Sequence, residues 1–378
     1  MPLTVVIVPD KFKGTLTAQA AAEAISRGWR KVRPHDRLEL IPMSDGGDGF
    51  GEILGGLNGA KVRSTMTVDA AGRRRAAPWW WAASNKTAIV ETAGVIGLAL
   101  LPPGAFHPFQ LDTFGLGRLL EVIAGYGAKR CLVGIGGSAT NDGGFGMARA
   151  LGWKFLDKES RQIQQWTELH RLSSLCAPEN PKLFRETVVA TDVKNRLLGM
   201  RGATRVYGPQ KGLRPGDFAL AERCLRRLAA VVKETLGKDF ARLPGAGAAG
   251  GLGFALNAFL GASCEPGFDL FLRHSKLQAH IKRADLVLTG EGAIDASTMM
   301  GKGVGQVARL CREIGVPCVA LAGTAKIKEG KRRLFTQIFA MTDLTSEGNA
   351  KMAAAVWLER MAGKAASNYG FDASFYRS

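Results

Sequence analysis

The sequence predicts a two-domain α/β protein, and three observations lead to this fold class. The chain has 378 residues, which is long for one domain and comfortable for two. Its hydrophobic fraction of 46% is enough for a substantial buried core. Short apolar runs rich in β-branched residues alternate with helical patterns, as they do in parallel βαβ units.

The apolar runs are nearly continuous, which is typical of strands covered on both faces. We expect eight strands, at TVVIV from Thr4, LELIPM from Leu38, KTAIVE from Lys86, RCLVGI from Arg130, ETVVAT from Glu186, DLVLT from Asp285, VPCVALA from Val316 and QIFAMT from Gln337. Helical patterns lie between several of them, at residues 18–32, 116–124, 219–236, 304–314 and 350–365.

The connections between these elements indicate how the domains divide. Compact crossovers follow the first two and the last three strands, whereas the middle of the chain carries longer connections such as AGRRRAAPWWWAAS. We therefore expect a Rossmann-like parallel-sheet domain built from both chain ends, residues 1–61 and 283–378. Residues 62–282 would form an inserted second α/β domain with a mixed sheet, and the ligand cleft would lie between the domains. The three tryptophans at 79–81 are expected to pack at an edge or interface.

Composition limits the partners and the location. The formal net charge of +18 fits either attraction of an anionic partner or a solvated basic surface. Because the basic clusters lack interleaved aromatic residues, we expect no nucleic-acid partner.

No apolar stretch reaches the roughly eighteen residues of a membrane span, and the first residues lack the order of a secretory signal, so we expect no membrane and a cytoplasmic location. The six cysteines form no C-x-x-C pair and the histidines are dispersed, which argues against disulfides and a histidine metal site.

Acidic residues follow several of the predicted strands. Asp10 follows the first strand, Asp45 and Asp48 the second, Asp192 follows VVAT, and Glu291 and Asp295 follow LVLT. Each alone could equally be a turn former or a helix cap. Ligands of parallel sheets bind beyond the carboxyl ends of the strands, and the joint placement of these acids beside glycines therefore favours a functional role.

The segment GIGGSATNDGGFGM from Gly134 is predicted to leave a strand and enter a helix. Backbone N–H groups at such a junction can bind phosphate or another anion, helped by the helix dipole. The candidate binding residues are Gly136, Gly137, Ser138, Thr140 and Asn141. The simpler alternative is that Thr140, Asn141 or Asp142 caps the helix, but capping leaves the glycines unexplained.

The same segment also supports a different enzyme class. Gly134-x-Gly136-x-x-Ala139 fits a relaxed dinucleotide fingerprint, and Asp157 lies near the position of a ribose-binding acid. An NAD-dependent hydroxy-acid dehydrogenase is therefore the alternative, although no histidine lies in a motif. The GxGxxG at Gly245–Gly250 is weaker because no strand precedes it, and the chain has no Walker A motif.

A third segment, TGEGAIDASTMMGKG from Thr289, suits phosphoryl transfer. It places Glu291 and Asp295 four residues apart and continues to Lys302. Two acids for Mg²⁺ and a lysine for phosphate oxygens are what this chemistry uses, while a solvated capping turn is the alternative. Lys13, in PDKFKGTLTA, is a candidate for a second phosphate contact or else an ordinary surface lysine.

Taken together, these motifs resemble those of the bacterial glycerate kinase family of the glycerate 2-kinase type. PDKFKGTLTA, SDGGDG, GIGGSATNDGGFGM, TDVKNRLLGMRGATRVYGPQKG, PGAGAAGGLG and TGEGAIDASTMMGKG occur in the family's order over nearly the full length. The resemblance implies an enzyme that transfers the γ-phosphate of ATP to a hydroxyl of D-glycerate, giving 2-phosphoglycerate. It implies ATP and Mg²⁺ as cofactors and a small-molecule partner, with a homodimer left open.

Transfer to an alcohol requires a base, charge neutralisation and positioning, and the sequence offers candidates for each. We assign Asp192 or Asp295 as the base or as a magnesium ligand, and Asp45 and Glu291 as supporting acids. Lys13 and Lys302 would contact phosphate, and the 136–141 loop would hold either phosphate or the glycerate carboxylate.

Four positions depart from the family pattern. Lys11 stands where serine is usual, Ala293 where arginine is usual, Ser297 where glutamine is usual and Gly303 where proline is usual. If the missing arginine normally touches phosphate or the substrate carboxylate, a kinase homologue with an altered substrate is a further alternative.

Overall fold

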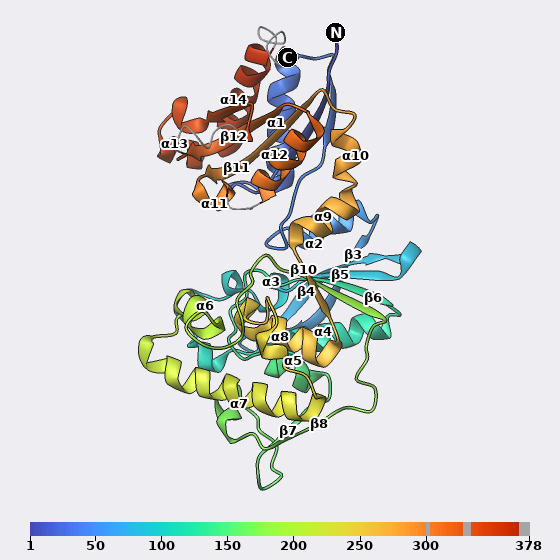
Figure 1. The fold of residues 1–378 in the computed structure, drawn as a ribbon, viewed down its shortest axis with the longest axis vertical. Coiled ribbons are helices and arrows are strands. Elements are labelled where there is room, and N and C mark those ends of the chain that lie inside the picture. Colours follow the sequence, from blue (N-terminus) through green and yellow to red (C-terminus); the bar gives the residue numbers. More distant parts are fainter. Residues whose placement is uncertain (300–302, 328–333, 370–378) are drawn as a thin grey trace. The chain divides into compact units, whose positions relative to one another are not determined.

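The computed structural model describes residues 1–299, 303–327 and 334–369 (Figure 1). The chain forms two compact units. The terminal unit consists of Met1–Asp45 and Phe268–Ser378, and the inserted unit is Gly46–Gly267. Relative to the division expected from the sequence, residues 46–61 belong to the inserted unit and residues 268–282 to the terminal unit.

The terminal unit contains a five-stranded parallel sheet in the order β13-β12-β11-β1-β2. Its strands are β1 (Thr4–Pro9), β2 (Arg37–Leu40), β11 (Leu286–Ile294), β12 (Cys318–Ala325) and β13 (Gln337–Ala340). The N-terminal strand and helix, drawn in blue, lie among orange and red elements of the C-terminal part (Figure 1). Both chain ends therefore build one sheet, as expected.

Seven helices of the terminal unit lie within the described ranges. They are α1 (Ala18–Val32), α9 (Gly267–Ser275), α10 (Leu277–Ile281), α11 (Ala296–Met299), α12 (Gly303–Ile314), α13 (Glu347–Met352) and α14 (Ala354–Tyr369). Helices α1 and α14 pack on one another and share a core with β1, β11 and β12. They meet at Gly28, where an added Cβ would lie 2.0 Å from the carbonyl oxygen of Glu359. Any larger residue at Gly28 would therefore separate the two helices.

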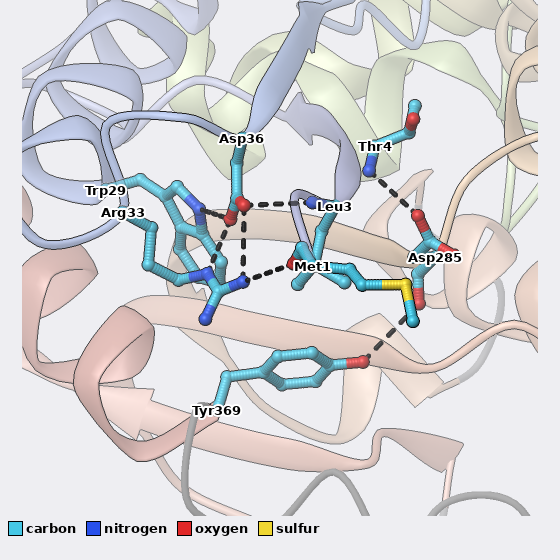
Figure 2. Close-up of polar contacts among 8 residues, drawn as sticks. All are labelled: Met1, Leu3, Thr4, Trp29, Arg33, Asp36, Asp285 and Tyr369. Carbon is cyan, nitrogen blue, oxygen red and sulfur yellow. Dashed lines mark hydrogen bonds and ion pairs between the residues drawn. The ribbon is translucent and has the colours of Figure 1, made fainter.

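A buried carboxylate fastens the first strand to α1 (Figure 2). Asp36 accepts hydrogen bonds from the backbone N–H of Leu3 and the indole N–H of Trp29, each at 2.9 Å, and from the Arg33 side chain. Although burial alone would raise the pKa of Asp36, the bonds from Arg33, Leu3 and Trp29 lower it below the ordinary value. Asp285 acts similarly at the start of β11, where it accepts from the Thr4 N–H at 2.8 Å (Figure 2).

The inserted unit contains a six-stranded mixed sheet in the order β10-β9-β6-β5-β4-β3. Strands β5, β6, β9 and β10 are parallel, whereas β3, β4 and β5 form antiparallel pairs. The bounds are β3 (Lys61–Val68), β4 (Arg74–Ala82), β5 (Thr87–Glu91), β6 (Arg130–Gly134), β9 (Glu186–Ala190) and β10 (Ser263–Glu265), and a separate antiparallel pair is β7 (Lys154–Leu156) with β8 (Ser174–Cys176). This arrangement and the parallel sheet of the terminal unit confirm the predicted fold class.

The helices of the inserted unit pack against this sheet or against one another. They are α2 (Phe50–Leu57), α3 (Ala93–Ile96), α4 (Phe114–Gly125), α5 (Phe145–Ala150), α6 (Ala203–Lys211), α7 (Phe218–Leu236) and α8 (Ala248–Leu260). Trp80 explains why α2 belongs to this unit, because its ring lies directly against Gly51 and Gly55 of α2. Trp79 is buried in the core, and Trp81 contacts it edge-on, so these tryptophans serve packing. Within the described ranges, no helix is long and apolar enough to span a membrane.

Candidate active site

Three carboxylates of the terminal unit gather at the carboxyl ends of its parallel strands. Asp10 follows β1, Asp45 follows β2, and Glu291 lies near the end of β11. Burial raises the pKa of Asp10 to about 7, and the negative charges of Asp45 and, more weakly, Glu291 act in the same direction. From the sequence, Asp10 is one of the acids that follow strands, with no specific role in the site; in the structure, the charges of Asp45 and Glu291 act on it.

Short polar contacts fix the segment that follows β11. The buried hydroxyl of Thr298 donates to Glu291 Oε1 at 2.7 Å and accepts from the Asp295 N–H at 3.2 Å. One threonine therefore orients Glu291 and begins the turn that carries Asp295. The Lys13 side chain is exposed, and its backbone nitrogen would lie 3.2 Å from a Cβ at Gly292. Lys302 lies outside the described residues.

In the inserted unit, the glycines of the 134–146 segment allow close packing. Cβ atoms at Gly134 and Gly136 would lie 2.6 Å from the Phe50 ring and 2.9 Å from Gly47 Cα. A Cβ at Gly144 would lie 2.1 Å from Ala255 Cβ. The SDGGDG segment and the 136–141 loop thus meet backbone to backbone, and residues larger than glycine would prevent this contact.

The polar residues of this loop are largely buried. Ser138 is 5% exposed, and Thr140 and Asn141 are fully buried. The helix that follows this loop, α5, has six residues and begins at Phe145. Its first turn is bound instead by Asp142, which accepts from the N–H groups of Gly144 and Gly146 at 3.1 and 3.0 Å. The N-cap position itself is Gly144, and of the three polar residues considered for capping it is Asp142 whose side chain binds the start of the helix.

Sequence reasoning missed a buried lysine beside this loop. Lys211, the last residue of α6, donates hydrogen bonds to Ser138 Oγ at 3.0 Å and to the carbonyl oxygen of Thr140 at 2.6 Å. Burial lowers the pKa of Lys211 to about 7, while the charge of Asp142 acts in the opposite direction. The only signal in the sequence was its place in the motif YGPQKG.

Asp192 lies at the carboxyl ends of β9 and β10. It follows β9 by two residues, and its Oδ1 accepts from the Gly267 N–H at 2.9 Å. The PGAGAAGGLG segment packs nearby, because a Cβ at Gly245 would lie 3.2 Å from Thr191 and one at Gly250 only 1.9 Å from the Thr140 oxygen. The structure thus brings the 136–141 loop, the PGAGAAGGLG segment and the end of β9 together within the inserted unit.

The acid on which the dehydrogenase alternative depends has a structural role. Asp157 accepts from the N–H groups of Glu159 and Arg161, at 3.0 and 2.9 Å, and pairs with Arg171 at 2.7 Å. These bonds, with that from Arg161 the strongest influence, lower the pKa of Asp157 despite some desolvation. Asp157 therefore closes a turn after β7.

The predicted site residues divide between the two units. Asp45, Glu291, Asp295 and Lys13 belong to the terminal unit, and Asp192 and the 136–141 loop to the inserted unit. Among the described residues, no group of three His, Cys, Asp or Glu side chains could hold a metal ion. The roles assigned to these residues, including Asp192 and Asp295 as magnesium ligands, stay predictions.

Fold and site together describe an α/β enzyme whose polar residues gather at the carboxyl ends of parallel strands. The sequence model of the glycerate kinase family matches residues 5–369, and the chain belongs to this family. This membership confirms the resemblance predicted from the motifs and the expected enzyme class, a phosphotransferase of the glycerate kinase type.

Individual relatives agree with this family. A glycerate kinase of Halalkalibacterium halodurans is 40% identical over 328 residues, and the glycerate 2-kinase of Escherichia coli K12 is 36% identical over 325 residues. Each alignment covers 85% of both chains. A crystal structure described as a glycerate kinase 2 from Salmonella typhimurium LT2 superposes with a TM-score of 0.86 at 32% identity, covering 99% of this chain and 100% of that one.

Proposed function

We propose that the protein transfers the γ-phosphate of ATP to a hydroxyl of D-glycerate, giving ADP and 2-phosphoglycerate. The observation that carries this proposal is the family match over residues 5–369, together with relatives at 36–40% identity that are named glycerate kinases. The choice of the 2-hydroxyl is supported by the Escherichia coli relative, which is named a glycerate 2-kinase.

The carboxylates of the terminal unit suit Mg²⁺. Magnesium in phosphoryl-transfer enzymes uses one or two carboxylates together with substrate phosphates, so no three-residue protein cage is needed. Asp45 and Glu291 supply such oxygens beside Asp10, whose pKa is raised by burial and by their charges. A bound Mg²⁺ would neutralise charge on the transferring phosphates. The sequence predicts Asp192 and Asp295 as magnesium ligands, and Asp295 belongs to the same unit as these carboxylates.

The protein's own residues would move the proton and hold the substrates. The hydroxyl that attacks phosphorus must lose its proton, and we assign its acceptor as the carboxylate of Asp192 or Asp295. Thr298 keeps Glu291 and the start of the Asp295 turn in place. Lys13 and Lys302 would contact the phosphate oxygens, and the 136–141 loop would bind the acceptor.

The direct test is an assay of the purified protein with Mg-ATP and D-glycerate, following ADP release and identifying the product by phosphorus NMR. We expect glycerate-dependent ADP and a 2-phosphate product. No ADP with glycerate would refute the proposal, ADP with another hydroxy acid alone would favour the altered-substrate alternative, and a 3-phosphate product would overturn the regiochemistry. Excess EDTA should abolish turnover, and added Mg²⁺ should restore it.

Substitution of each aspartate identifies the base. Asp192→Asn and Asp295→Asn each remove a carboxylate at similar volume, and loss of the base should lower kcat by about 10² to 10⁴. Asp239→Asn is the matched control, because within the described residues Asp239 forms ion pairs with the exposed side chains of Lys233 and Arg242, and such pairs contribute little. Turnover at the wild-type level in both site variants would show that neither Asp192 nor Asp295 is the base. The cytoplasmic location and the homodimer stay predictions of the sequence.

A further inference from the structure

The ammonium group of Lys211 is buried in the inserted unit without a counter-ion. The residue is 6% exposed, and both of its hydrogen bonds go to neutral acceptors, Ser138 Oγ and the Thr140 carbonyl oxygen. Among the described residues no carboxylate forms an ion pair with it. Lysine is almost never so buried unless it is paired, because an isolated buried charge is costly. The fold alone therefore gives no reason for a lysine here.

Asp142 is the charge that acts on Lys211, but its carboxylate is committed elsewhere. Its Oδ2 accepts from the N–H and the hydroxyl of Thr113, at 3.0 and 2.7 Å, and from the Gly146 N–H. Its Oδ1 accepts from the Gly144 N–H. The hydrogen bonds of Asp142 thus hold the start of α5, and the ammonium group of Lys211 is available to interact with a ligand.

The loop that Lys211 contacts also carries unused polar atoms. Thr140 Oγ1 and Asn141 Oδ1 are buried and have no hydrogen-bond partner among the described residues. The amide of Asn141 is fixed by its bond to Thr204 Oγ1 at 3.1 Å. Gly137 is exposed, whereas the next residue, Ser138, is buried and contacts Lys211. The buried lysine therefore lies close to the solvent-exposed part of the loop.

We propose that Ser138 and Lys211 form a binding site for a small carboxylate, that of the acceptor substrate, and that Lys211 sets the preference for anionic over neutral alcohols. The identity of the substrate rests on the proposed function. Because Ser138 Oγ accepts from Lys211, its own hydrogen is left to donate to the ligand. In its protonated form Lys211 offers one buried positive charge, which matches a monoanion. The phosphates of ATP share the oxyanion chemistry but carry several charges, which favour Mg²⁺ and more than one cation.

The test combines a change in the protein with a change in the substrate. Lys211→Met is compared with wild type on D-glycerate and on glycerol, in which a neutral CH₂OH replaces the carboxylate. We expect the ratio of kcat/KM for glycerate to that for glycerol to fall by about 10², as when a buried charge pair loses one partner. KM for ATP should change less than about threefold. Arg205→Met is the control, because it removes an exposed cation from the same helix and should leave the ratio unchanged.

A second variant keeps the test decisive if Lys211→Met fails to fold. Ser138→Ala leaves the lysine in place and should lower kcat/KM for glycerate by about tenfold, the usual effect of one lost hydrogen bond. Thermal unfolding by circular dichroism establishes whether each variant is folded. A folded Lys211→Met or Ser138→Ala variant with the wild-type preference for glycerate, or one whose defect lies in KM for ATP, would overturn the proposal.

A calorimetric measurement of D-glycerate binding in the absence of nucleotide tests the proposed site independently of turnover. We expect wild type to bind glycerate and Lys211→Met to bind it at least about thirtyfold more weakly. Lysine-dependent glycerate binding without turnover would refute the kinase proposal and support the site. Turnover of glycerate that neither variant impairs would refute the site and support the kinase. Absence of glycerate binding by wild type would overturn the site.

Discussion

Gly136→Ala should impair turnover more than stability, because the added methyl group strikes the backbone at the candidate site. Its Cβ would lie 2.9 Å from Gly47 Cα, whereas carbon atoms pack at about 3.5–4.0 Å. The SDGGDG segment and the 136–141 loop would therefore have to separate by at least about 0.6 Å. Overpacking of this kind costs about 1–3 kcal/mol of unfolding free energy, and a misplacement near 1 Å can lower turnover about 10²-fold. We expect kcat/KM for D-glycerate to fall by one to two orders of magnitude.

The assay is steady-state kinetics with a coupled ADP readout, alongside urea unfolding of the same preparations. Gly94→Ala is the matched control, because Gly94 lies in α3 at an ordinary backbone angle and its added methyl would meet only Pro78 at 3.6 Å. We expect Gly94→Ala to keep wild-type kinetics. If the folded Gly136→Ala variant matched it in kcat/KM, the contact between the two segments would not position the site.

Three further predictions concern stability. Asp36→Ala removes the acceptor of Trp29 and Leu3 and should lower the unfolding free energy by about 2–4 kcal/mol at pH 7. Because the pKa of Asp36 is lowered in the folded state, the difference in unfolding free energy between wild type and variant should shrink as the pH falls below about 4. An equal loss of unfolding free energy at about pH 3 and pH 7 would contradict this. Burial, and then the charge of Asp142, raise the pKa of Asp112 to about 6, so ionisation opposes folding as the pH rises through that range. Asp112→Asn should therefore raise the melting temperature at pH 7.5 but not at pH 4, and a lower value at pH 7.5 would count against the argument. Gly144→Ala places a methyl 2.1 Å from Ala255 Cβ at a φ of +73° and should cost about 2–5 kcal/mol in urea unfolding, whereas Gly216→Ala, with open space around it, should cost little.

The strands that the sequence predicted are those with continuous apolar runs. Each of the eight runs overlaps one of the strands β1, β2, β5, β6, β9, β11, β12 and β13. Six of these strands are largely buried, which leaves a plain apolar pattern, whereas the edge strands β2 and β13 are only partly buried. Strand β3 was missed because it is an edge strand with mostly exposed, polar residues, and β7, β8 and β10 have only three residues each. The segment AGRRRAAPWWWAAS was interpreted as a connection, but it contains β4, whose apolar run is interrupted by arginines and a proline. The single helix expected at 350–365 is two helices, α13 and α14, and the break at Ala353 involves neither glycine nor proline.

The candidate site was predictable where position along a strand decides it. Asp45, Asp192 and Glu291 do lie at the carboxyl ends of parallel strands, as their places after apolar runs indicated. Lys211 could not be found in this way, because lysines are mostly exposed and only the tertiary packing of α6 against the 136–141 loop buries this one. The close packing of the glycines at 134, 136 and 144 could not be predicted, since spacing does not reveal what lies opposite a missing side chain. Their role in anion binding stays a prediction.

The pairing of α1 with α14 has a consequence for synthesis on the ribosome. Helix α1 is translated early, but the partner against which its Gly28 face packs ends at Tyr369, near the C-terminus. Every strand of the mixed sheet emerges in between, so the inserted unit can fold while the nascent chain is still growing. The apolar side of α1 therefore cannot be covered by its helical partner until α14 has been synthesised.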